Sequence, residues 1–236
     1  MPADDHPVLA AVLWDMDGTL IDSERLWDVS LQATARELGG ELSARARDSL
    51  VGVDIDTSIV VLLGDVGVPA TPERIAWTYE RLVVQTEELF VAGDVEWRPG
   101  ARAALEAVRA AGLPTALVTN SLRRITELAL EGIGREFFDV SVCGDEVPAG
   151  KPAPDAYLRA AQLLGVPIDE CVAVEDSPNG ALAAERAGAA VLVVPCEVPV
   201  PTGPGRVHRD DLVGLTAAEL GGVLRALSGT DEERVA

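Results

Sequence analysis

Residues 8–20 read Val-Leu-Ala-Ala-Val-Leu-Trp-Asp-Met-Asp-Gly-Thr-Leu, an apolar run that ends abruptly at Asp15 and Asp17. An apolar run followed at once by charge and Gly18 is typical of a strand that is buried on both faces and ends at the carboxyl edge of a parallel sheet. Ligands of α/β proteins bind at that edge. Two carboxylates there repel each other, and a divalent cation with oxygen ligands offsets such repulsion. Taken alone, the motif also fits an acidic turn.

The composition predicts a globular protein with one large domain, or with one domain that carries a smaller insertion. The chain has 236 residues, of which 48% are hydrophobic and 25% charged, and no apolar stretch approaches the length that crosses a bilayer. The first residues lack the pattern of a secretory signal. The three cysteines, Cys143, Cys171 and Cys196, are widely spaced and form no C-x-x-C pair. We therefore expect reduced thiols and a cytoplasmic protein.

The charge of the chain argues against two classes of partner. Its formal net charge is -20, which repels nucleic acid and anionic membranes. Eighteen of its 19 basic residues are arginine, so Lys151 is the only lysine. A position that keeps lysine against this bias suggests a need for a compact ammonium group rather than a planar guanidinium. The alternative is a leftover lysine on a surface loop.

The pattern of apolar residues predicts a parallel sheet with an all-helical insertion. Strands and helices alternate from about residue 95, which indicates βαβ units. The expected strands are 114–118, 138–142, 171–174 and 189–194, and the expected helices are 100–111, 121–131, 154–164, 178–187 and 216–227. Between the first strand and this region, helical periodicity covers 23–38, 43–50, 55–64 and 72–91. We expect this insertion to lie over the acidic motif as a lid.

Polar side chains follow three further strands, each at its carboxyl end. Thr119, Asn120 and Ser121 combine a hydroxyl group with backbone amides at a predicted helix start, which suits an anionic oxygen. Lys151 lies between Gly150 and Pro152 on a stiff loop, and Glu175 and Asp176 form a second carboxylate pair. Each group alone could belong to an ordinary turn or cap, but their gathering at one sheet edge predicts a site.

The four motifs D-M-D-G-T-L, V-T-N-S, G-K-P and V-E-D-S-P-N-G, in this order, resemble those of the haloacid dehalogenase superfamily of phosphatases and phosphoglucomutases. The helical insertion is similar to the C1-type cap of that family. The resemblance implies a Rossmann-like, doubly wound parallel α/β sheet whose first strand is central. It also implies a catalytic core of residues 1–22 and 95–236 and a cap domain of residues 23–94.

The resemblance further implies roles for the motif residues. Asp15 would be the nucleophile that forms an aspartyl-phosphate, and Asp17 the general acid and base. Mg²⁺ would bind the Asp15 and Asp176 carboxylates and the backbone carbonyl of Asp17, with Glu175 as a ligand or as a partner of the ligands. The phosphoryl group would be held by Thr119, Asn120 and Lys151. The candidate specificity residues in the cap are Glu24, Trp27, Arg47 and Ile55.

These roles predict a Mg²⁺-dependent phosphatase for a small phosphorylated metabolite such as a sugar phosphate. One alternative is a β-phosphoglucomutase, but its cap carries basic residues that grip a second phosphate, whereas residues 50–57 here are acidic and apolar. Phosphonate hydrolysis is disfavoured because residues 23–94 contain no lysine. A phospho-accepting receiver domain is a more distant alternative, against which stand the chain length, the insertion and Asp17.

Overall fold

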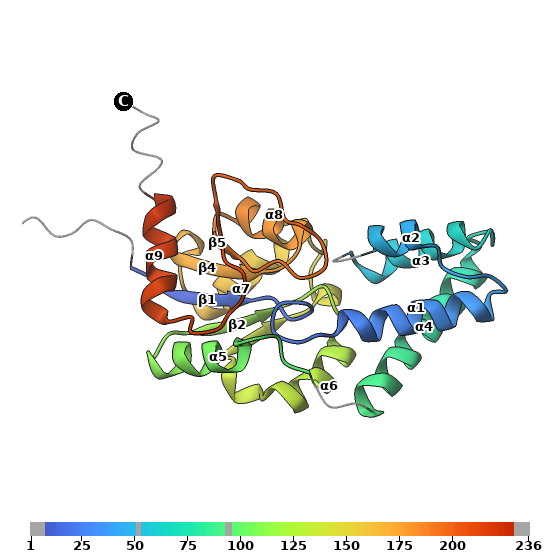
Figure 1. Ribbon diagram of the computed structural model, residues 1–236, viewed down its shortest axis with the longest axis horizontal. Coiled ribbons are helices and arrows are strands. Elements are labelled where there is room, and N and C mark those ends of the chain that lie inside the picture. Colours follow the sequence, from blue (N-terminus) through green and yellow to red (C-terminus); the bar gives the residue numbers. More distant parts are fainter. Residues whose placement is uncertain (1–7, 51–52, 93–95, 229–236) are drawn as a thin grey trace, which may run out of the picture.

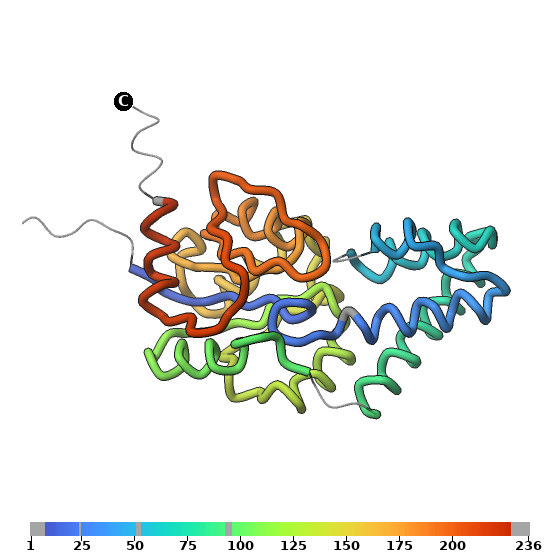
Figure 2. Tube along the Cα trace, viewed as in Figure 1, coloured from blue at the N-terminus to red at the C-terminus, as the bar shows by residue number. Residues whose placement is uncertain are grey.

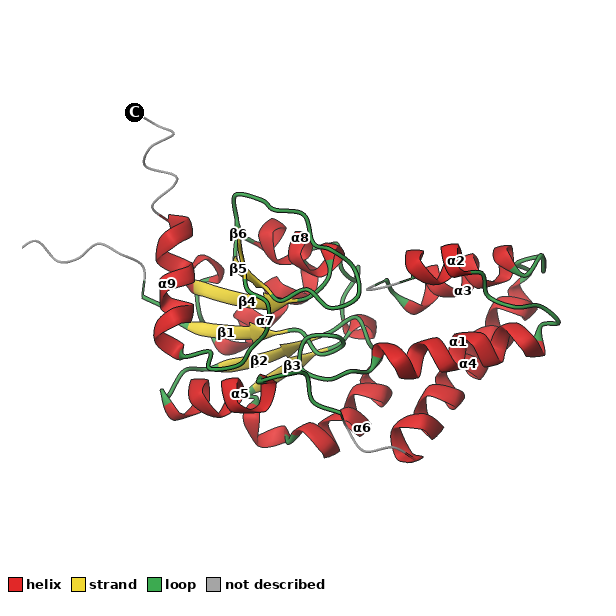
Figure 3. Cartoon of the chain, viewed as in Figure 1, coloured by secondary structure: helices red, strands yellow, loops and turns green. Residues whose placement is uncertain are grey.

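Six parallel strands form one sheet in the order β3-β2-β1-β4-β5-β6. The computed structural model describes residues 8–50, 53–92 and 96–228. The strands are β1 (Ala11–Trp14), β2 (Thr115–Val118), β3 (Val140–Val142), β4 (Cys171–Glu175), β5 (Ala190–Val193) and β6 (Arg206–His208). The first strand is central, between β2 and β4, as expected (Figure 3). The prediction of a doubly wound parallel sheet is thus confirmed.

Helices cover both faces of the sheet, because neighbouring residues of each strand point to opposite sides. Val12 and Trp14 of β1 pack in one buried cluster with α5 (Ala101–Ala110), α6 (Arg123–Ile133) and α9 (Ala217–Ser228). On the other face, Ala11 and Leu13 pack with α7 (Asp155–Leu164) and α8 (Pro178–Ala187). Both clusters consist of buried hydrophobic side chains, which explains why the strand sequences read as continuous hydrophobic runs.

Four helices between β1 and α5 form a block beside the carboxyl edge of the sheet (Figure 1). They are α1 (Glu24–Glu37), α2 (Ala44–Ser49), α3 (Ile55–Asp65) and α4 (Pro72–Ala92). This block, called the cap below, has its own buried core, which includes Leu31, Ile59 and Leu82. The chain runs out from β1 into α1 and returns from the end of α4 towards α5 (Figure 2). We propose residues 23–94 as the bounds of the cap domain.

Three local features differ from the sequence prediction. Helix α6 starts at Arg123 rather than at residue 121, because the backbone of Leu122, which precedes it, is extended (ψ 148°). Strand β3 begins at Val140 rather than at residue 138, after a turn of 3-10 helix at Arg135–Phe137; similar turns span Gly144–Glu146 and Ile168–Glu170. The edge strand β6 was not expected, since it is brief and follows a loop rich in proline and glycine.

No helix in the described ranges combines the length and the apolar character that spanning a bilayer requires.

Candidate active site

The carboxyl ends of β2, β1 and β4 lie side by side and carry the predicted motifs. Asp15 directly follows β1, and its backbone N–H donates to the carbonyl oxygen of Val174 in β4 at 3.0 Å. Thr119 directly follows β2, while Glu175 ends β4 and Asp176 comes next. Because the strands are parallel and in register, residues more than 150 positions apart in the sequence meet at one edge.

Lys151 is buried at the centre of this edge, with 3% of its surface exposed. Its Nζ donates to Oδ1 of Asp15 at 2.6 Å, to Oε1 of Glu175 at 2.6 Å and to the carbonyl oxygen of Val118 at 2.9 Å. An ammonium group has three donors, so these contacts use all of them. Although burial lowers the pKa of Lys151, the two carboxylates outweigh it and raise that pKa. The compact ammonium expected here is the group that the geometry accommodates.

The backbone of Lys151 is fixed by the side chain of Asn120. The N–H of Lys151 donates to Oδ1 of Asn120 at 2.8 Å, and Nδ2 of Asn120 donates to the carbonyl oxygen of Lys151 at 3.2 Å. The side chain of Asn120, a residue predicted to bind phosphate, therefore joins the loop after β2 to the lysine loop. A contact of Asn120 with phosphate would come from its backbone N–H.

Tyr157 also belongs to the site, although it lies outside the four sequence motifs. It lies on α7 with no exposed surface, and its hydroxyl donates to Oε1 of Glu175 at 2.5 Å. Glu175 is equally buried, and its Oε1 thus accepts from both Tyr157 and Lys151. The sequence could have indicated Tyr157, because a tyrosine on the buried face of a predicted helix needs a hydrogen-bond partner for its hydroxyl.

The carboxylate of Asp15 has one anchored and one unpartnered oxygen. Its Oδ1 accepts from Lys151, whereas Oδ2 is buried and has no hydrogen-bond partner among the described residues. Burial, followed by the charge of Glu175, raises the pKa of Asp15 from 3.8 to about 7, against the opposing effect of Lys151. A buried polar oxygen without a partner is costly, so this atom is suited to meet a cation or an electrophile.

Three buried carboxylates at this edge could hold a metal ion. One oxygen each of Asp15, Glu175 and Asp176 lie within 4.8 Å of one another. Gly18 makes room for Asp176, because a Cβ at Gly18 would lie 2.1 Å from Oδ2 of Asp176, and its φ of +83° suits glycine. Hard oxygen donors, together with the unpartnered oxygen of Asp15, fit Mg²⁺.

Three hydroxyl groups hold the carboxylate of Asp17. Ser23, which precedes α1, donates to Oδ1 at 2.5 Å, while Thr119 and Ser121 donate to Oδ2 at 2.8 Å each. The hydroxyl of Thr119 also accepts from the N–H of Ser121 at 3.0 Å. Asp17 thus joins the end of β1 to the loop after β2 and to the base of the cap.

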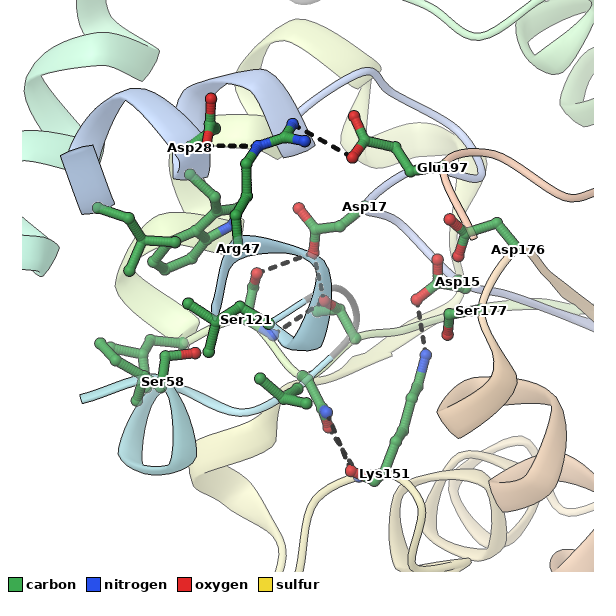
Figure 4. Close-up of a pocket in the computed structure, with 18 residues that line it drawn as sticks. Asp15, Asp17, Asp28, Arg47, Ser58, Ser121, Lys151, Asp176, Ser177 and Glu197 are labelled. Atoms are coloured by element: carbon green, nitrogen blue, oxygen red, sulfur yellow. Dashed lines mark hydrogen bonds and ion pairs between the residues drawn. The ribbon is translucent and has the colours of Figure 1, made fainter. Parts of the chain in front are cut away.

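One pocket lies between the cap and this edge (Figure 4). The predicted residues that line it are Asp15, Asp17, Trp27, Arg47, Ile55, Thr119, Asn120, Lys151 and Asp176. Glu175 does not line it, and its buried carboxylate accepts from Lys151 and Tyr157. The side chain of Glu24 lies outside what the structure describes. Asp28 and Glu197 line the pocket without having been predicted. Nothing in the local sequence marks them, because acidic residues are common throughout this chain.

Comparison with known proteins agrees with this geometry. The profile of the haloacid dehalogenase-like hydrolases matches residues 9–188. Hexitol phosphatase B of Escherichia coli K12 is 34% identical, over 79% of this chain and 84% of that protein. A probable pseudouridine-5'-phosphatase of Drosophila melanogaster is 32% identical, over 78% of this chain and 80% of that protein.

Solved structures show the same fold. A mutant of CbbY from Rhodobacter sphaeroides, in complex with xylulose-(1,5)bisphosphate, has a TM-score of 0.81 at 29% identity. The match covers 90% of this chain and 99% of the CbbY chain. A β-phosphoglucomutase from Clostridium difficile has a TM-score of 0.82 at 18% identity, a likeness in fold alone, over 97% of this chain and 100% of its own. The chain therefore belongs to the haloacid dehalogenase-like hydrolases.

Proposed function

We propose that this phosphoric monoester hydrolase removes phosphate from a small phosphorylated sugar or a similar polyol, with Mg²⁺ and through an aspartyl-phosphate on Asp15. The observation that carries the proposal is the state of the Asp15 carboxylate. It is buried at the pocket floor, bonded to Lys151 through one oxygen, and unpartnered at the other. The named phosphatases among the relatives support the substrate class.

In the first half-reaction, an oxygen of Asp15 forms a bond to phosphorus while the bond from phosphorus to the leaving oxygen breaks. Asp17 lines the same pocket and gives a proton to that leaving oxygen. The ammonium of Lys151 and the hydroxyl of Thr119 stand beside the two aspartates, where they can offset charge on the phosphoryl oxygens. Bound by Asp15, Asp176 and the backbone carbonyl of Asp17, Mg²⁺ would supply positive charge that keeps Asp15 ionised and draws the phosphate in.

In the second half-reaction, Asp17 takes a proton from water, and the oxygen of that water attacks phosphorus. The bond from phosphorus to Asp15 breaks, which frees phosphate and restores the carboxylate. The hydroxyls of Ser23, Thr119 and Ser121 keep Asp17 in position for both proton transfers. We also propose that the enzyme works in the cytoplasm, where its three free cysteines would stay reduced.

A phosphate-release assay over hexose, hexitol, pentose and nucleoside monophosphates, with Mg²⁺ and after its removal by a chelator, tests the proposal. We expect release from at least one sugar-type phosphate and none without the metal. Absence of release from every compound would contradict it. Conversion of β-glucose 1-phosphate to glucose 6-phosphate with a bisphosphate primer, and little free phosphate, would instead indicate the mutase alternative.

A further inference from the structure

The part of the pocket that faces the leaving group has an apolar wall and a charged rim. The cap side chains Trp27, Leu31 and Ile55 line the wall, together with Leu50 and Val53. The rim consists of Asp28 on α1, Arg47 on α2 and Glu197 on the loop after β5, which all line the pocket as well. Arg47 is the only cationic side chain that the described part of the cap contributes to the lining.

The guanidinium of Arg47 is already bound by two carboxylates (Figure 4). Its Nε donates to Oδ1 of Asp28 at 2.6 Å, and one terminal nitrogen donates to Oε2 of Glu197 at 3.3 Å. About a third of each side chain is exposed, at 36%, 30% and 32% for Arg47, Asp28 and Glu197. Hydrogen bonding to Asp28 is the main reason that the pKa of Arg47 is raised. The rim as a whole therefore carries a net negative charge rather than a free cation.

The remaining pocket gives no second anion site. Its lining carries the carboxylates of Asp15, Asp17, Asp28, Asp176 and Glu197. Against these stand the cations Arg47 and Lys151, and the bonds of Lys151 to Asp15, Glu175 and Val118 hold it at the reacting end of the pocket, beside the nucleophile. When Asp17 holds the proton that it gives to the leaving oxygen, a bound divalent cation only brings this lining to neutrality, so no positive charge is left over for a second anion beside the reacting phosphate. A charged group on the leaving side would meet like charge, which is an effective way to reject a ligand.

We infer that the enzyme acts on substrates with a single phosphate and an uncharged, hydroxyl-bearing leaving group, and that the rim of Asp28, Arg47 and Glu197 excludes a second phosphate or a carboxylate. This inference rests on the proposed function. A hydroxyl group can donate to a free lone pair of either rim carboxylate, or accept from an unused N–H of Arg47, without breaking either ion pair. The C–H face of a sugar can pack on the apolar wall. A second phosphate at an unused N–H of Arg47 would lie beside the carboxylates of Asp28 and Glu197, which already balance the charge of Arg47.

Matched pairs of substrates test the inference. In each pair the second compound adds one anionic group to the side of the molecule that leaves: xylulose 5-phosphate with xylulose 1,5-bisphosphate, followed by release of the C5 phosphate, and 2-hydroxyethyl phosphate with 2-phosphoglycolate. With Mg²⁺ present, we expect kcat/KM to be at least about tenfold higher for the uncharged member of each pair. Equal values would overturn the inference alone, whereas no release from any sugar-type phosphate would overturn the proposed function and the inference with it.

The variant Glu197→Gln assigns the discrimination to the rim. It keeps the side-chain shape but removes one negative charge and leaves Arg47 with one carboxylate partner fewer. The ratio of kcat/KM between the uncharged and the charged member of each pair should therefore fall about tenfold, mainly through a lower KM for the charged member. Asp28→Asn, on the other side of Arg47, should act in the same direction. The control is Glu219→Gln, which changes the net charge equally but lies on α9 beside Arg209, outside the pocket lining. An unchanged ratio in both rim variants, or an equal shift in the control, would overturn the inference.

Discussion

The ammonium group of Lys151 lies 2.6 Å from Oδ1 of Asp15 and leaves Oδ2 of the same carboxylate without a partner in the described part of the chain. One oxygen thus fixes the orientation of the carboxylate while the other stays available. The same ammonium binds Glu175 at 2.6 Å, so a single cation balances two buried acids. This relationship links the stability of the sheet edge to its chemistry.

Replacing Lys151 by Met should damage both stability and activity. The variant leaves Asp15 and Glu175 buried together without their cation, and breaking a buried ion pair in this way costs about 3–5 kcal/mol. Urea unfolding measures this loss, and phosphate release should fall at least about a hundredfold. Arg225→Met, which removes an exposed cation, is the control and should change the free energy of unfolding by less than about 0.5 kcal/mol. Similar stability of the two variants would contradict the role of Lys151 in stabilising the buried carboxylates of Asp15 and Glu175.

The protonation of Asp15 should make the metal-free protein less stable as pH rises. Its pKa is about 7 in the folded protein and 3.8 as the ordinary value, so the folded state binds the proton more tightly. The stabilising contribution is full below pH 3.8 and is lost as pH rises through about 7. We therefore expect the free energy of unfolding of the wild type to fall from pH 5 to 8, relative to Asp15→Asn, when a chelator is present.

Added Mg²⁺ should reverse this trend, because its ligands bind in the ionised form. The rise in Tm on adding Mg²⁺ should be larger at pH 8 than at pH 5. A rise in Tm that is independent of pH, or that is unchanged in Asp15→Asn, would argue against a metal at this carboxylate.

Gly18→Ala should weaken metal binding. The new Cβ would lie 2.1 Å from Oδ2 of Asp176, so the carboxylate must move away from the site. Calorimetric titration with Mg²⁺ should show at least about tenfold weaker affinity. Gly39→Ala is the control for backbone strain without a clash. Gly39 also has a positive φ, +90°, but a Cβ placed there has no contact within 4 Å among the described residues. Equal Mg²⁺ affinities in the two variants would show that Asp176 does not need this space.

Tyr157→Phe should lower kcat although Tyr157 does not line the pocket. The change removes one hydroxyl and with it the hydrogen bond to the carboxylate of Glu175. A hydrogen bond to a charged group contributes about 1.5–3 kcal/mol to the stability of the fold. With Glu175 less firmly held, Lys151 loses its fixed position, and kcat should fall about tenfold with little change in KM. Tyr79→Phe, at the other tyrosine of the chain, is the matched control. A rise in KM with unchanged kcat would point to a role in substrate binding instead.

The sequence was sufficient for the sheet and for much of its carboxyl edge, because the apolar runs end at the residues that carry charge. Asp15, Thr119 and Asp176 were predictable on that ground, since parallel strands bring their ends together. Lys151 lies on a loop well after β3 and was predictable because it is the only lysine of the chain. Glu197 was not predictable, because its bond to Arg47 joins residues 150 positions apart and depends on how the cap sits on the sheet. The packing of the cap on the sheet depends on tertiary contacts, which the periodicity of apolar residues in the sequence does not reveal.

Catalysis through Asp15 is tested by phosphate release from the best sugar phosphate of the wild type, with Mg²⁺ and the variant Asp15→Asn. The amide keeps the size of the side chain but is a poor nucleophile, so we predict a loss of at least about a thousandfold in kcat, with a folded protein by circular dichroism. A folded variant that keeps kcat within about tenfold of the wild type would contradict catalysis through an aspartyl-phosphate on Asp15.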